Sequence, residues 1–214
     1  MKVFVSWSGG KDCALAAYKA MSQGHQVLYL ANLISEDGQR ARSHGIRREV
    51  IALQAKAMGI PLIQVKTSWE EYEENFKRAV RELKNKGVEA GVFGDIDVEE
   101  HRQWVEWVCG ELEITPLLPL WQTDPAELLS EFFKLGFKAV VIATKLDQNL
   151  LGRGLDESLI AEIQGLGAHP SGEHGEYHSF VTDGPILKRP LKLTQGEIRE
   201  RDDAWLLDIS VELG

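Results

Sequence analysis

The sequence has few cysteines, no excess of basic residues and no long apolar run. Cys13 and Cys109 are the only cysteines among 214 residues, too few for a disulfide-stabilised scaffold and unsuited by their spacing to a zinc site. No apolar run approaches the length of a transmembrane helix, and we expect no signal peptide. These absences argue against a disulfide-rich secreted domain and predict a cytoplasmic protein without a membrane partner.

The charge balance is acidic, with a formal net charge of −9. Contacts between basic side chains and phosphates dominate the affinity of proteins for nucleic acids. This acidic balance therefore argues against a broad surface that binds RNA or DNA. Arg40, Arg42, Arg47 and Arg48 form one local basic group, which is open to three interpretations: a small RNA patch, a solvated surface or a phosphate-binding loop. We expect a small-molecule or protein partner rather than tRNA.

The most informative stretch is Ser8-Gly9-Gly10-Lys11-Asp12. It follows an apolar run that ends at Ser6 and precedes a helical pattern of small and apolar residues. Glycines let backbone N–H groups approach phosphate oxygens, and a helix N-terminus favours negative charge. The spacing differs from that of a Walker loop, in which a serine or threonine follows the lysine directly. The stretch therefore predicts a nucleotide polyphosphate site of another type.

Apolar runs alternate with helical periods, which predicts an α/β fold with a doubly wound parallel sheet. We expect strands at 2–6, 26–33, 61–65, 90–93 and 115–118, and helices at 11–23, 46–58, 69–85 and 99–112. Three prolines between residues 116 and 125 mark a second, smaller α+β unit. Its expected elements are helices at 125–135 and 157–166 and strands at 137–143, 177–182, 186–193 and 205–213. We therefore divide the chain into a nucleotide-binding domain, 1–119, and an acceptor domain, 120–214.

One helical face in the segment 69–85 is strongly apolar. Trp69, Tyr72, Phe76, Val80 and Leu83 recur at helical spacing. We expect this face to belong to the core rather than to a binding site.

Ligands of doubly wound sheets bind where the strand order reverses, beyond the carboxyl ends of the strands. The loop after the fourth strand, with Gly94 and Asp95, should therefore face the glycine turn. Gly94 would allow close approach of the nucleotide, and Asp95 would hold Mg²⁺ or a ribose hydroxyl. His44 is placed to contact ATP. Arg102 is equally suited to a phosphate contact and to a solvated helix face.

A second polar cluster occupies residues 172–178 and reads Gly-Glu-His-Gly-Glu-Tyr-His. Glu173, Glu176 and Tyr177 are its candidates for acceptor binding and catalysis, because such turn-rich loops carry hydrogen-bonding and acid–base groups. A zinc site is the rival interpretation, but His174 and His178 lack helical H-x-x-x-H spacing and no cysteine lies nearby.

Together these motifs resemble the diphthine–ammonia ligase family of N-type ATP pyrophosphatases. The resemblance covers nearly the whole chain and includes His101-Arg102 and Leu151-Gly152-Arg153. It implies a Rossmann-like fold of the HUP class, with ATP at Ser6, residues 8–12 and Arg153. It also assigns Lys11, Glu173, Glu176 and Tyr177 to catalysis. Two positions depart from the family pattern: Cys13 replaces a serine, and His174 replaces a glycine.

The resemblance implies a reaction in which ATP adenylates a carboxylate and ammonia displaces AMP, with pyrophosphate as the other product. The cofactors that it implies are ATP and Mg²⁺. The implied acceptor is diphthine on elongation factor 2, or an unknown small carboxylate if the source is bacterial. Two alternatives stay open, an ATP-binding sensor without ligase activity and an adenylating tRNA-modification enzyme. The sequence also leaves open a homo-oligomer.

Overall fold

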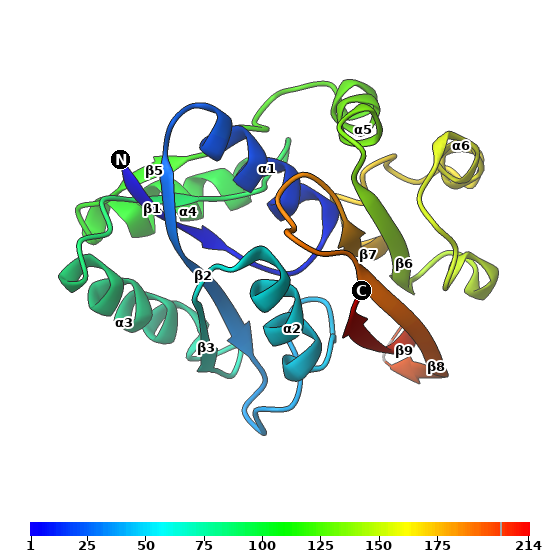
Figure 1. Ribbon diagram of the computed structural model, residues 1–214, viewed down its shortest axis with the longest axis horizontal. Helices are drawn as coiled ribbons and strands as arrows, with labels where there is room; N and C mark the ends of the chain where they lie inside the picture. Colours follow the sequence, from blue (N-terminus) through cyan, green and yellow to red (C-terminus); the bar gives the residue numbers. More distant parts are fainter. Residues whose placement is uncertain (202) are drawn as a thin grey trace.

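A computed structural model describes residues 1–201 and 203–214. Its first sheet is parallel and has the strand order β3-β2-β1-β4-β5, so the order reverses between β1 and β4 (Figure 1). The five strands are β1 (Lys2–Ser6), β2 (Gln26–Ile34), β3 (Leu62–Lys66), β4 (Ala90–Val92) and β5 (Thr115–Leu117). The doubly wound sheet expected from the sequence is confirmed.

Helices cover both faces of this sheet, so β1 is buried on both sides. Val3 and Val5 pack into one apolar cluster with α1 and α2, whereas Phe4 packs into a second cluster with α3 and α4. This alternation follows from the period of two along a strand. The four helices are α1 (Lys11–Ser22), α2 (Arg48–Met58), α3 (Tyr72–Asn85) and α4 (Glu99–Glu111).

The second half of the chain builds an antiparallel sheet of order β7-β6-β9-β8. Asp124 caps α5 by accepting from the backbone N–H of Ala126 at 2.7 Å, with Pro125 at the first helical position. The elements are α5 (Pro125–Lys134), β6 (Lys138–Thr144), η1 (Gln148–Leu150), α6 (Glu157–Gly165), β7 (Tyr177–Asp183), β8 (Leu191–Arg201) and β9 (Ala204–Leu213).

The two halves are tied together on the α1 and α2 side of the first sheet, where Figure 1 shows α1 and α2 facing the second sheet. One apolar cluster contains buried residues of both halves. Arg40 and Arg47 each reach Asp208 of β9 at 3.2 Å. Two of the four arginines of the basic group are thereby engaged within the protein. The division at residues 119 and 120 stays a prediction.

Two expectations about the elements are wrong. The third strand of the acceptor half begins at Leu191 and extends to Arg201, because Pro190 offers no N–H to a ladder and the polar residues beyond 193 continue to pair with β9. Trp69 does not belong to the core face of α3. It precedes that helix, which begins at Tyr72, and its side chain is 60% exposed. No helix among the described residues is long and apolar enough to cross a membrane.

Candidate functional site

A cavity of about 540 Å³ opens at the carboxyl edge of the first sheet, beside the reversal between β1 and β4. Its walls come from the loops after β1, β2, β3 and β4, from α4, and from residues 172–178. Seven residues proposed from the sequence line it: Ser6, Ser8, Asp12, His44, Gly94, Asp95 and Glu173. Loops far apart in sequence thus meet at one pocket, as the strand reversal requires.

The glycine turn at the pocket is held by side chains that the sequence patterns did not single out. Gly9 adopts a φ of 87°, which favours glycine. Its carbonyl accepts from Gln54 Nε2 at 3.1 Å and from the backbone N–H of Val181 at 2.9 Å. Gln54 lies on α2 and is fully buried. A glutamine in an amphipathic helix gives no sequence signal for this role.

The N-terminus of α1 follows this turn. Gly10 is its N-cap, and no side chain among the described residues caps it there. The N–H of Lys11 donates to Ser179 Oγ of β7 at 3.2 Å. The first turn of α1 at the pocket wall is still a candidate anion site, because backbone N–H groups point out of a helix N-terminus and the helix dipole favours negative charge there.

Gly94 packs closely against the backbone of α1, whereas the sequence predicted a contact between Gly94 and the nucleotide. A Cβ on this residue would lie 2.9 Å from both the carbonyl carbon of Asp12 and the nitrogen of Cys13. Gly94 is therefore needed first for the close approach of the loop after β4 to the start of α1. It also lines the pocket. Its expected nucleotide contact stays a prediction.

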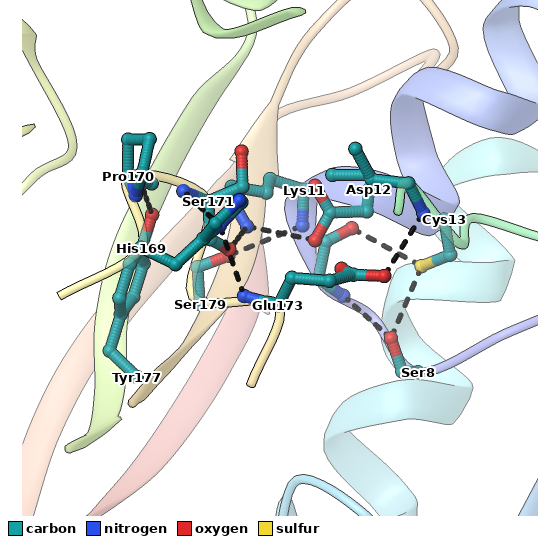
Figure 2. A network of polar contacts seen from close by, with 12 residues as sticks. Ser8, Lys11, Asp12, Cys13, His169, Pro170, Ser171, Glu173, Tyr177 and Ser179 are labelled. Carbon is teal, nitrogen blue, oxygen red and sulfur yellow. Dashed lines mark hydrogen bonds and ion pairs between the residues drawn. The ribbon is translucent and has the colours of Figure 1, made fainter. Parts of the chain in front are cut away.

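The Lys11 side chain points away from the pocket wall. It is 5% exposed, and its Nζ lies 2.8 Å from Asp12 Oδ2, donates to the Ser171 carbonyl and sits 5.1 Å from the centre of the Tyr177 ring (Figure 2). Burial lowers the pKa of Lys11, but the charges of Asp12 and Tyr177 outweigh it, so the pKa is raised and the amine stays protonated. In this arrangement the cation joins the glycine turn to residues 169–173.

Glu176 and Tyr177 stabilise the loop that carries the second motif. Glu176 accepts from the backbone N–H groups of His169 at 2.9 Å and His174 at 3.0 Å. Tyr177 is 2% exposed, and its hydroxyl donates to the Pro170 carbonyl at 2.7 Å. Neither side chain lines the pocket. The sequence assigned both to catalysis, whereas their contacts fit a supporting role.

Of the three catalytic candidates in the second motif, Glu173 is the one that lines the pocket. Its Oε1 accepts from the backbone N–H of Ile96 at 3.0 Å. One ligand atom from each of Asp95, His101 and Glu173 lies within 4.8 Å of the others, so the three residues form a candidate cation site. Burial, followed by the charges of Asp12 and Asp95, raises the pKa of Glu173 to about 7.

Two histidines form another part of the wall. The rings of His44 and His178 have their centres 4.2 Å apart, and both side chains line the pocket. Burial lowers the pKa of His178 to about 4, assisted by Lys11, and the pKa of His44 is lowered well below its usual range by burial and by His178. Both imidazoles are neutral at pH 7 and present hydrogen-bond acceptors.

Five of the predicted ATP contacts do not line the pocket, namely Gly9, Gly10, Lys11, Arg102 and Arg153. Arg153 forms a two-point ion pair with Glu162, with distances of 2.7 and 2.9 Å. Arg102 pairs with Glu106 at 2.7 Å and lies over the Trp121 ring. For Arg102, the alternative of a solvated helix face fits these contacts better. The cysteine at the α1 start is not activated, since burial raises the pKa of the Cys13 thiol.

Aromatic residues form another wall of the pocket, and the sequence patterns assigned two of them, Trp69 and Tyr72, to the core. Trp69, Tyr72 and Trp104 all line the pocket, and together they are called the aromatic wall below. Arg42 lies beside them, with its guanidinium 4.6 Å from the centre of the Trp69 ring. The helical spacing of Trp69 and Tyr72 concealed this role, because α3 begins only after Trp69.

Comparison with known proteins matches both halves of the chain to one family. Residues 1–116 match the diphthamide synthase N-terminal domain, and residues 124–212 match the diphthamide synthase C-terminal domain. A protein of Methanocaldococcus jannaschii, described as a predicted subunit of tRNA methyltransferase, shares 15% identity at a TM-score of 0.49, covering 86% of this chain and 98% of that chain.

Curated relatives carry one name. The diphthine–ammonia ligase of Schizosaccharomyces pombe is 32% identical over 99% of this chain and 39% of its own length. The enzymes of that name from Bos taurus and Homo sapiens are each 29% identical over 92% of this chain and 85% of their own length. This chain thus spans about two fifths of the length of the yeast relative. With both domain models matched along it, the chain belongs to the diphthamide synthase family.

Proposed function

We propose that this chain is an ATP-dependent carbon–nitrogen ligase that joins ammonia to a carboxylate of diphthine. ATP would first adenylate that carboxylate with release of pyrophosphate, and ammonia would then displace AMP to leave an amide. Elongation factor 2 is the proposed carrier of the diphthine. The proposal is supported by the family membership and by the names of the relatives.

The observation that carries the proposal is the composition of the 540 Å³ pocket. The start of α1 forms one wall through Ser8, Asp12 and Cys13. Asp95, His101 and Glu173 form another. The first wall suits the phosphates of a nucleotide. The second comes partly from a motif 160 residues away, which a protein that only sensed ATP would not need beside the phosphates.

The residues present also fit Mg²⁺. Magnesium prefers oxygen ligands and commonly binds through one or two carboxylates and the phosphates of a substrate. Asp95 and Glu173 supply such carboxylates next to the wall formed by Ser8, Asp12 and Cys13, which is called the phosphate wall below. Bound there, the cation would neutralise charge on the departing pyrophosphate. Without a cation, Asp12, Asp95 and Glu173 would repel the phosphates of ATP, since all three line the same cavity.

The nitrogen nucleophile requires acceptors rather than cations at the pocket wall. His44 and His178 are neutral at pH 7 because the pKa of each is lowered, foremost by burial. Their ring nitrogens can accept hydrogen bonds from ammonium and hold it as it loses a proton. The carboxylate of Glu176 is already bound to two backbone N–H groups. It is therefore the less suitable group for this step.

The test uses ATP labelled at the α-phosphate, elongation factor 2 that carries diphthine, and ammonium chloride. We expect AMP and pyrophosphate that depend on both the acceptor and ammonium. Asp95→Asn should abolish this turnover, whereas the matched change Asp156→Asn, at the exposed N-cap of α6, should leave it nearly unchanged. ADP and orthophosphate as products would contradict the proposal. Bound, uncleaved ATP would support a sensor instead.

A further inference from the structure

The three residues of the aromatic wall line the pocket and contact one another. The Trp69 and Tyr72 rings stack with centres 5.7 Å apart and an interplanar angle of 26°. Tyr72 meets Trp104 at 5.9 Å and 56°. Trp69 is 60% exposed at the pocket mouth. Exposing this much aromatic surface beside a cavity forgoes burial, so the wall is best explained by a ligand that covers it.

The angle between the rings favours a compact cation over a flat group. The rings of Tyr72 and Trp104 are inclined at 56° and are not parallel. A flat base held between two rings needs those rings to be parallel. The negative face of each ring attracts a cation, and quaternary ammonium groups are recognised by such inclined aromatic residues.

Charges around the wall agree with a cationic ligand. Asp95 and Glu100 line the same pocket as the three aromatic residues. The negative charge of Asp95 acts on Tyr72, whose pKa is raised to about 12 by burial and by this carboxylate. Arg42 already places its guanidinium over the Trp69 ring. The guanidinium of Arg42 thus already makes a cation–π contact with the aromatic wall.

We infer that the aromatic wall binds the trimethylammonium group of the acceptor. The inference rests on the proposed function, because diphthine carries a trimethylammonium group on the same carbon as its carboxylate. Holding the methylated nitrogen against Trp69, Tyr72 and Trp104 would place the neighbouring carboxylate inside the pocket that also contains the phosphate wall. The wall would thereby orient the carboxylate and select the methylated acceptor over an unmethylated one.

A binding experiment that needs no turnover tests the wall alone. Choline and 3,3-dimethylbutan-1-ol have the same shape and differ in charge. Binding of each to the full chain is measured by saturation-transfer NMR titration. We expect choline to bind about tenfold more tightly than the neutral alcohol, as befits a desolvated cation–π contact. Trp69→Leu should remove this preference while the alcohol still binds.

The matched control is Trp107→Leu. Trp107 is also an exposed tryptophan, at 46%, and it lies on α4 with Lys77 over its ring, outside the pocket. This variant should keep the choline preference. Arg42→Ala should bind choline at least as tightly as the unaltered chain, because a competing cation is removed. A Trp69→Leu chain that keeps the full preference for choline would overturn the inference.

The same variants separate the wall from the ligase activity. If Trp69→Leu loses affinity for AMP but not the preference for choline, the wall binds the adenine base and the inference fails. If choline binding behaves as expected while no AMP forms with the acceptor, the inference stands and the proposed ligase function fails. With an active enzyme, Trp69→Leu should raise KM for the acceptor about tenfold and leave KM for ATP unchanged.

Discussion

Replacing Glu173 with glutamine should stabilise the protein at alkaline pH. The carboxylate lies half-buried beside other acids, and burial and these charges raise its pKa from 4.5 to about 7. Glutamine keeps an oxygen that can accept from the backbone N–H of Ile96, as Oε1 of Glu173 does at 3.0 Å. The substitution therefore removes the titrating charge with little change in shape.

The sign follows from proton binding. Between pH 4.5 and 7 the folded chain holds a proton on Glu173 that the unfolded chain has released, so this contribution to stability is lost as pH rises through 7. A shift of this size corresponds to about 3 kcal/mol. Because Glu173 is partly exposed, solvent screening reduces the expected effect to about 2 kcal/mol.

Urea unfolding at pH 5 and pH 8.5, with EDTA present to remove metal ions, measures the effect. The free energy of unfolding of Glu173→Gln, relative to that of the unaltered chain, should be about 2 kcal/mol larger at pH 8.5 than at pH 5, which means a more stable variant. Glu176→Gln is the control with opposite sign. It should destabilise the chain by about 1 kcal/mol at both values, since it loses a backbone hydrogen bond. An identical effect of Glu173→Gln at the two pH values would refute the reasoning.

Three further outcomes are expected. Gly94→Ala should lower the free energy of unfolding in urea by about 1–3 kcal/mol, because its Cβ would lie 2.9 Å from backbone atoms of Asp12 and Cys13; unchanged stability would contradict this packing. Arg153→Ala should leave the affinity for ATP, measured by isothermal titration calorimetry, unchanged, since Arg153 pairs with Glu162 outside the pocket. Asp95→Asn should weaken Mn²⁺ binding, detected by electron paramagnetic resonance, at least about tenfold. Equal Mn²⁺ affinity would remove Asp95 from the cation site.

The glycine turn and the start of α1 could be placed from the sequence because their signals are local. The apolar run to Ser6, two glycines and a helical period each have a direct structural meaning, and the parallel order brings the loops after β1 and β4 together. The expected neighbours Asp12 and Gly94 are in contact. The N-cap at Asp124 is equally local, because it needs only a short polar side chain and the following proline.

Other parts of the site depend on contacts between distant residues. Gln54 joins Gly9 to β7, although nothing in its own helix distinguishes it from a surface glutamine. Trp69 fits the apolar period of α3 but precedes the helix, so periodicity assigned it to the core. Arg153 and Arg102 carry the charge expected of a phosphate contact. Their positions relative to the pocket depend on folding, which motif spacing does not encode.

The position of Lys11 joins the two motifs physically. A lysine beside a glycine turn suggests a mobile cation for phosphate, yet here its Nζ binds Asp12 and the Ser171 carbonyl. To reach a phosphate, Lys11 would have to release Ser171, which begins the turn that places Glu173 at the pocket. Movement of the cation toward ATP would thus loosen the loop that carries the acceptor motif. If Lys11 bound the phosphates in place of the loop, the geometry around Glu173 would depend on the nucleotide.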